Sequence, residues 1–107
     1  MTTVQVWRDE NGVTGLKVKG HAGYAEEGSD IVCAAASILI TTCANALESV
    51  AGVTPVLKVV EEPALIAVSL PEDLSPEQDH DARIILNTCM QGFDDIAAQY
   101  PRYLQII

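Results

Sequence analysis

The chain has 107 residues, with 6 Lys and Arg against 15 Asp and Glu, which gives a formal net charge of −9 at neutral pH. This length fits one domain, so residues 1–107 are predicted to form a single domain. A phosphate-binding surface normally needs clustered basic side chains, and the six here are scattered along the sequence. We therefore expect no direct nucleic acid partner and no anionic membrane, whereas an acidic surface favours a basic protein or peptide.

Cysteine usage and the first residues indicate the compartment. Three cysteines cannot all pair within one chain, and no signal-peptide pattern opens the sequence. These features predict a reducing, cytoplasmic setting. The uncharged run at 31–47 has 17 residues, the lower limit of about 17 for a membrane span. Because this run contains polar side chains and lacks flanking Lys or Arg, we expect a buried or interface helix instead.

The first elements along the chain form a predicted β-hairpin. Residues 3–7 alternate between apolar and polar side chains, and residues 13–18 form a second apolar-rich segment. Asn11 and Gly12 lie between the two segments and can turn the chain through positive φ. Residues 20–29 hold three glycines and no regular period, which predicts a loop, and its length of about ten residues favours a functional role.

A helix is predicted next, from residue 31 to about residue 50. Ser29 or Asp30 can cap its first turn by accepting a bond from a backbone N–H, and Gly52 and Pro55 end it. Apolar residues surround nearly its whole circumference. This helix should therefore be covered on more than one side, in part by a second copy of the chain.

The second half repeats the order of hairpin and then helix. The expected elements are strands at 56–60 and 65–70, a linker at 71–76, a helix at 77–99 with one apolar stripe, and a short last strand at 103–107. The resulting order, ββαββα(β), predicts an α+β fold resembling an α/β sandwich. Its sheet should be antiparallel or mixed, with both helices on one face.

Cys33 is the main candidate for chemistry. If Asp30 caps the helix, Cys33 is the third helical residue, where backbone N–H groups and the helix dipole favour the nucleophilic thiolate. The same N–H groups can stabilise an oxyanion. His21 lies twelve residues earlier, and a loop that folds back can bring its imidazole beside the thiol to accept the proton. Gly20 and Gly23 allow close backbone approach there.

Each candidate also has a plainer interpretation. A cysteine at an apolar helix start is commonly a core residue, and a histidine beside glycines is commonly an ordinary loop residue. Ser37, one turn after Cys33, can hydrogen-bond at the site or bond back to the Cys33 carbonyl. Glu26 and Glu27 can be solvated or can meet a basic substrate.

The remaining cysteine and histidine residues give no further site. Cys43 and Cys89 lie within the predicted helices and are expected in the core, and His80 lies in a charged first turn and is expected to be solvated. No Cys or His pair has metal-ligand spacing. The glycine motifs of nucleotide-binding folds and the Gly-x-Ser-x-Gly elbow are also absent from the sequence, so we expect neither a metal nor a cofactor.

Two segments of the chain carry a family signature: Gly-His-Ala at residues 20–22 and Ser-Asp-Ile-Val-Cys-Ala-Ala-Ala-Ser at residues 29–37. Together they resemble the signature of the ribosomal-processing cysteine protease Prp family, and the element order and size match over essentially the whole chain. The resemblance implies a homodimeric cysteine protease domain with His21 as general base and Cys33 as nucleophile. It further implies that the enzyme removes an N-terminal extension from a large-subunit ribosomal protein.

The same resemblance assigns secondary roles. Gly20, Asp30 and Ser37 would support the site. The loop positions expected to contact substrate are Gly23, Tyr24, Glu26, Glu27 and Gly28. Asp30 can orient His21, but its carboxylate is engaged if it caps the helix, which favours a Cys–His dyad over a triad. The alternative from another class is a non-catalytic dimeric module that binds a basic ribosomal or peptide partner through its acidic face.

Overall fold

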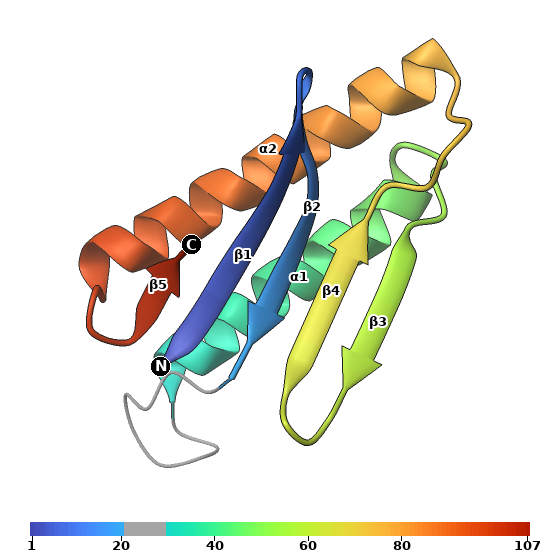
Figure 1. Cartoon of the computed structure of the whole chain (residues 1–107). Coiled ribbons are helices and arrows are strands. Elements are labelled where there is room, and N and C mark those ends of the chain that lie inside the picture. The colour runs from blue at the N-terminus through green and yellow to red at the C-terminus, as the bar shows by residue number, and fades with distance from the viewer. Residues whose placement is uncertain (21–29) are drawn as a thin grey trace.

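A computed structural model shows a five-stranded sheet with two helices on one face (Figure 1). It describes residues 1–20 and 30–107. The strands are β1 (Thr2–Asp9), β2 (Gly12–Lys19), β3 (Val56–Val60), β4 (Leu65–Ser69) and β5 (Leu104–Ile106), and the helices are α1 (Ile31–Ser49) and α2 (Pro76–Gln99). The predicted α+β class, element order and one-sided helix layer are confirmed.

The sheet is mixed, and its strand order is β3-β4-β2-β1-β5. Neighbouring strands are antiparallel except β5, which runs parallel to β1 after the chain returns through α2. A parallel neighbour requires a long crossover, and α2 supplies it. The first hairpin is longer than its alternation predicts, and Gly12 turns the chain at φ 116°.

Helix α1 is buried along one face only. Its buried stripe faces the sheet and α2 and consists of Val32, Ala36, Ile40, Cys43, Ala44 and Leu47. On the outer side, Ile31 and Ile38 are 53% and 64% exposed. The expected cover on more than one side is therefore not present within a single copy. By length and composition, α1 is the one described helix that could cross a membrane, although core helices of soluble proteins meet the same criterion.

Helix α2 begins one residue before its predicted start. Ser75 accepts the backbone N–H of Gln78 at 3.1 Å, and the Gln78 side chain accepts the Ser75 N–H at 3.1 Å, which completes a capping box. Pro76 therefore belongs to the helix and not to the linker. The physical reason is that the first helical residue needs no N–H donor, so proline is well suited to this position.

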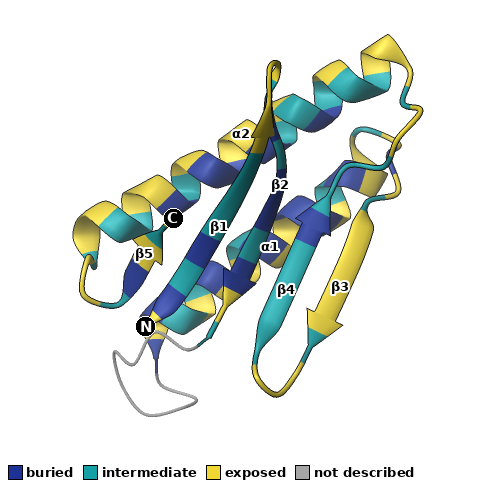
Figure 2. Ribbon diagram, viewed as in Figure 1, coloured by how far each residue is buried: buried dark blue, intermediate teal, exposed yellow. Residues whose placement is uncertain are grey.

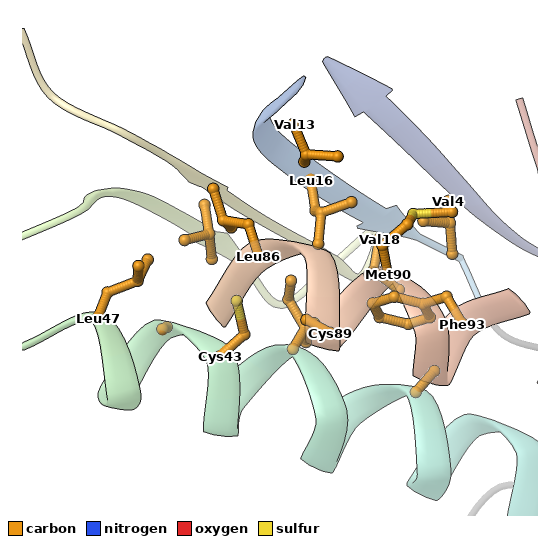
Figure 3. Packing of buried hydrophobic residues seen from close by; sticks show 14 of the residues in the cluster. Val4, Val13, Leu16, Val18, Cys43, Leu47, Leu86, Cys89, Met90 and Phe93 are labelled. Atoms are coloured by element: carbon orange, nitrogen blue, oxygen red, sulfur yellow. The ribbon is translucent and has the colours of Figure 1, made fainter. Parts of the chain in front are cut away.

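The core lies between the sheet and the helix pair. Figure 2 shows buried residues along the inner sides of α1, α2, β1 and β2, whereas β3 is mostly exposed. Phe93 and Leu16 are fully buried at the centre of this layer, and Cys43 and Cys89 pack in the same cluster (Figure 3). The prediction that the last two cysteines belong to the core is confirmed.

The far end of the first hairpin is tied to α2 by an ion pair. Both guanidinium Nη atoms of Arg83 donate to the two carboxylate oxygens of Asp9, at 2.7 and 2.9 Å. The hydrogen bonds from Arg83 lower the pKa of Asp9 to about 2. Arg83 also donates through Nε to Asp79 at 2.9 Å, so one arginine joins the hairpin to the first turns of the helix.

Candidate active site

Asp30 organises the start of α1. It is 8% exposed, and its carboxylate oxygen Oδ1 accepts the backbone N–H groups of Val32 and Cys33, both at 3.0 Å. Its carbonyl oxygen accepts the N–H of Ala34 at 3.0 Å, the first bond of the helix. The predictions that Asp30 caps the helix and that Cys33 is its third residue are confirmed.

These hydrogen bonds correct one expectation about the chemistry. The N–H groups at the helix start were expected to hold an oxyanion beside the thiol. The two N–H groups of Val32 and Cys33 already donate to Asp30, so they do not also point at a reacting carbonyl oxygen. The same cap that fixes the helix start thus uses the donors that the oxyanion would need.

Gly20 fixes the path of the chain where it leaves β2. Its φ is 84°, a left-handed conformation that favours glycine, and a Cβ placed there would lie 3.0 Å from the carbonyl oxygen of Met1. Its N–H donates to the carbonyl oxygen of Ala64 at 2.9 Å, which ties this strand end to the β3–β4 hairpin. The residue that follows in the chain is His21.

Most of the predicted loop contacts lie outside the described residues. These are His21, Gly23, Tyr24, Glu26, Glu27 and Gly28, together with Ser29 as the alternative cap. The described residues thus include the thiol and the two ends of the loop, Gly20 and Asp30. The roles given to the residues between those ends stay predictions.

A small pocket of about 90 Å³ opens beside Cys33. Its lining residues come from β2, α1 and the β3–β4 hairpin: Val18, Gly20, Cys33, Ser37, Ile40, Ala64, Leu65 and Ile66. The pocket brings together three residues that the sequence singled out: Gly20 at the end of β2, and Cys33 and Ser37 one turn apart on α1. Cys33 is half-buried there and Ser37 is exposed. This arrangement gives a thiol at the edge of an apolar recess that can receive a side chain.

Three further lining residues of the pocket were not predicted from the sequence. They are Ala64, in the turn before β4, and Leu65 and Ile66, the first two residues of that strand. Their apolar pattern is the pattern of any strand in a core, so nothing in the sequence distinguishes a residue that lines a pocket from one that packs inside. Their role follows from the pairing of β4 with β2, which sets them beside the end of β2.

The other two cysteines lie in a different environment. Cys43 and Cys89 are 3% and 4% exposed, and the Cys89 thiol donates to the carbonyl oxygen of Leu39 at 3.7 Å. Its hydrogen bond with Cys43 and its burial raise the pKa of Cys89 well above the ordinary value of a thiol. Buried thiols of this kind are poor nucleophiles. Cys33 is the most exposed of the three cysteines, which supports it as the reactive one.

The second histidine lies at the surface of the described part of the chain. The His80 side chain is 73% exposed and its Nδ1 lies 3.2 Å from Asp81, so the prediction of a solvated histidine is confirmed. Within residues 1–20 and 30–107, no three Cys, His, Asp or Glu side chains are grouped to hold a metal ion.

Known proteins resemble this chain in sequence and in structure over nine-tenths of its length or more. A ribosomal processing cysteine protease Prp from Bacillus subtilis (strain 168) is 28% identical over 97 residues, which is 91% of this chain and 87% of that protein. The crystal structure of an essential ribosomal processing protease Prp from S. aureus, in complex with a covalently linked product peptide, matches with a TM-score of 0.89. It is 25% identical, and the match covers 99% of this chain and 97% of that one.

A second crystal structure also matches the fold over nearly the whole chain. A protein from Streptococcus mutans matches with a TM-score of 0.86 and 27% identity, over 99% of this chain and 91% of that one. The family described as cysteine protease Prp matches residues 1–105. Since this match extends over nearly the full length, the chain belongs to the cysteine protease Prp family.

Proposed function

We propose that this protease is an endopeptidase that removes an N-terminal extension from a large-subunit ribosomal protein, with Cys33 as nucleophile and His21 as general base. The observation that carries the proposal is the placement of Cys33 in the capped first turn of α1, half-buried at the edge of a pocket. The S. aureus relative holds a covalently linked product peptide, which is the kind of bond that a nucleophilic mechanism forms.

The reaction proceeds in two steps. His21 accepts the proton of the Cys33 thiol, and the thiolate attacks the carbonyl carbon of the scissile bond. The tetrahedral intermediate collapses to a thioester as His21 gives its proton to the leaving amine. Water then attacks the thioester, His21 accepts a proton from that water, and the departing Cys33 sulfur recovers it. The carboxyl product leaves and the enzyme returns to its starting state.

Asp30 acts in this scheme as a positioning residue. Its carboxylate holds the first turn of α1 by two backbone hydrogen bonds. These bonds fix the backbone from which the Cys33 side chain projects. A carboxylate engaged in this way supports a Cys–His dyad over a triad. Gly20 sets the direction of the chain immediately before the general base.

The substrate is inferred to be a basic protein. The chain carries a net charge of −9, and an acidic protein attracts a basic partner and speeds its encounter. The pocket beside Cys33 is small and largely apolar, which suits one small side chain next to the scissile bond. The loop positions Gly23, Tyr24, Glu26, Glu27 and Gly28 would supply the remaining contacts.

Cleavage of a peptide that spans the extension junction tests this function. Cys33→Ala and His21→Ala should each abolish cleavage, whereas Cys43→Ala should retain it, because Cys43 is buried away from the pocket. Cleavage by Cys33→Ala at the wild-type rate would refute the mechanism. If the corresponding ribosomal protein of the same genome carries no extension, the substrate assignment is wrong even when the thiol is reactive.

We also propose that two copies associate in the cytoplasm. The support is the exposed apolar surface of α1, where Ile31 and Ile38 face outward, and the edge strand β3, where Val56, Leu57 and Val59 are each more than half exposed. An apolar edge strand left open invites pairing with another chain. The alternative of a non-catalytic binding module is set aside, since the family is one of cysteine proteases.

A further inference from the structure

The sheet face opposite the helices carries all three lysines of the chain. Residues that pair directly across antiparallel strands point to the same face. Lys58 pairs with Ala67, and Ala67 pairs with Lys17, so both lysines share that face, and Lys19 lies two residues further along β2. The buried residues next to them, Leu16 and Val18, point to the helices instead. The lysines therefore form a cluster that the linear sequence does not show.

This helix-free face holds no carboxylate at its outward strand positions. These positions are Thr3, Gln5, Trp7, Gly15, Lys17, Lys19, Val56, Lys58, Val60, Leu65, Ala67, Ser69 and Gln105. Among the described residues, no Asp or Glu lies within 4 Å of the three ammonium groups. The face is thus locally positive on a chain whose net charge is −9.

An aromatic ring lies beside the lysines. Trp7 pairs directly with Gly15, and a Cβ on Gly15 would lie 2.9 Å from Cε3 of the indole, so the ring packs over the glycine. The ammonium group of Lys17 is 5.9 Å from the ring centroid. Beyond Gly15 in the same row comes the small side chain of Ser69. The indole therefore lies across a part of the sheet without bulky neighbours.

A recess continues from the lysines toward the end of β2. It has a volume of about 360 Å³ and is lined by Met1, Thr3, Gln5, Lys17, Lys19, Gly20 and Ile107. Its polar groups are an amide, a hydroxyl and two ammonium groups, which together can bind a phosphate and a sugar. In Figure 1 neither helix reaches this side of the sheet.

We propose that the helix-free face binds a single-stranded RNA segment, with the three ammonium groups on phosphates and a base stacked on Trp7. Positively charged surfaces with aromatic side chains are the common means of binding single-stranded nucleic acid. An acidic peptide would use the lysines but not the indole, so the ring favours RNA. Repulsion from the acidic side chains elsewhere is screened over about 8 Å at physiological salt. This proposal revises the expectation that scattered basic residues exclude nucleic acid.

Binding of a ten-nucleotide oligouridylate to the full chain tests the proposal. Trp7 is the single tryptophan of the chain, so quenching of its fluorescence reports stacking directly. We expect quenching at 50 mM salt and an affinity that falls with salt at a log–log slope of about −2, as three phosphate contacts on a single strand imply. The double variant Lys17→Gln/Lys58→Gln should bind at least about tenfold more weakly, with a slope nearer −1. Arg102→Gln, a charge removed outside this face, should bind within about twofold of wild type.

Three results would overturn the proposal. One is the absence of quenching at 50 mM salt. Another is equal binding by the double variant and by Arg102→Gln, which would show that the lysine cluster is not the site. The third is displacement of the RNA by a ten-residue oligoglutamate at equal concentration, which would assign the face to an acidic peptide.

Discussion

One carboxylate oxygen of Asp30 accepts the backbone N–H of Cys33 at 3.0 Å, so the residue that caps α1 also holds the residue that bears the thiol. The same oxygen accepts the N–H of Val32, and the side chain is almost fully buried. Stability of the helix start and placement of the nucleophile therefore depend on one side chain. Removing it should affect both.

Substitution of the two helix caps separates these effects. Asp30→Ala and Ser75→Ala each remove a cap that accepts backbone N–H groups, and each should lower the free energy of unfolding by about 1 kcal/mol. Only Asp30→Ala should also lower kcat/KM for the junction peptide, by at least about tenfold, because small displacements of a reacting group are costly. Urea unfolding and peptide cleavage measure the two quantities.

Asp30→Asn is the matched control for this prediction. Its side-chain oxygen can still accept the two N–H groups, so its stability should stay within a few tenths of a kcal/mol of wild type. Equal kcat/KM values for Asp30→Ala and Ser75→Ala would show that the cap does not position Cys33.

The three thiols should differ in alkylation rate. Iodoacetamide at neutral pH should modify Cys33 first, since Cys43 and Cys89 are 3% and 4% exposed and the pKa of Cys89 is raised by its bond with Cys43 and by burial. Mass spectrometry of peptides from a time course measures the order. Addition of the junction peptide should slow the modification of Cys33 alone. Uniform rates in the native protein would contradict the assignment of the nucleophile.

The pair of Asp9 and Arg83 should make stability depend on acid pH. The pKa of Asp9 is about 2 in the folded chain and 3.8 in an unperturbed carboxyl, so the folded state favours the charged form. The stabilisation is complete above the unfolded value and is lost as the pH falls toward 2. Asp9→Asn should therefore flatten the decline of the unfolding free energy between pH 4 and pH 2. Urea unfolding across this range measures it.

Arg83→Gln provides the second arm of that experiment. Because Arg83 is the main cause of the lowered pKa of Asp9, its removal should flatten the same part of the curve, although Asp79 also loses a partner. Curves that stay as steep as wild type in both variants would show that the ion pair does not form in solution.

The outer face of α1 should determine the association of two copies. Ile38 is 64% exposed, and a charge there should not disturb the buried stripe on the opposite side of the helix. Light scattering at micromolar concentration should give a dimer mass for wild type and a monomer mass for Ile38→Asp. Gln99→Glu, an added acid at an exposed position of α2, tests whether any added acid has this effect. A monomer mass for wild type would contradict the proposed homodimer.

Local patterns in the sequence predict most of the fold. The alternation in the first hairpin, the glycine at its turn and the apolar stripe of α2 each reflect short-range geometry that residue types report directly. The cap at Asp30 was likewise recognisable, because a side chain that accepts N–H groups must stand at a fixed offset from the helix start. The structure begins α2 one residue before the predicted start, because proline fits the first helical position as well as it fits a linker.

The sequence alone was enough to identify the family signature, the order of the elements and the position of Cys33 in a first helical turn. Each of these can be read from local patterns of residue types. Only the tertiary structure decided that Ala64 and its neighbours line the pocket beside the thiol and that the three lysines share one face. These relationships join residues from separate elements, and they depend on strand register. A shift of one residue in that register would turn every side chain of the strand to the other face.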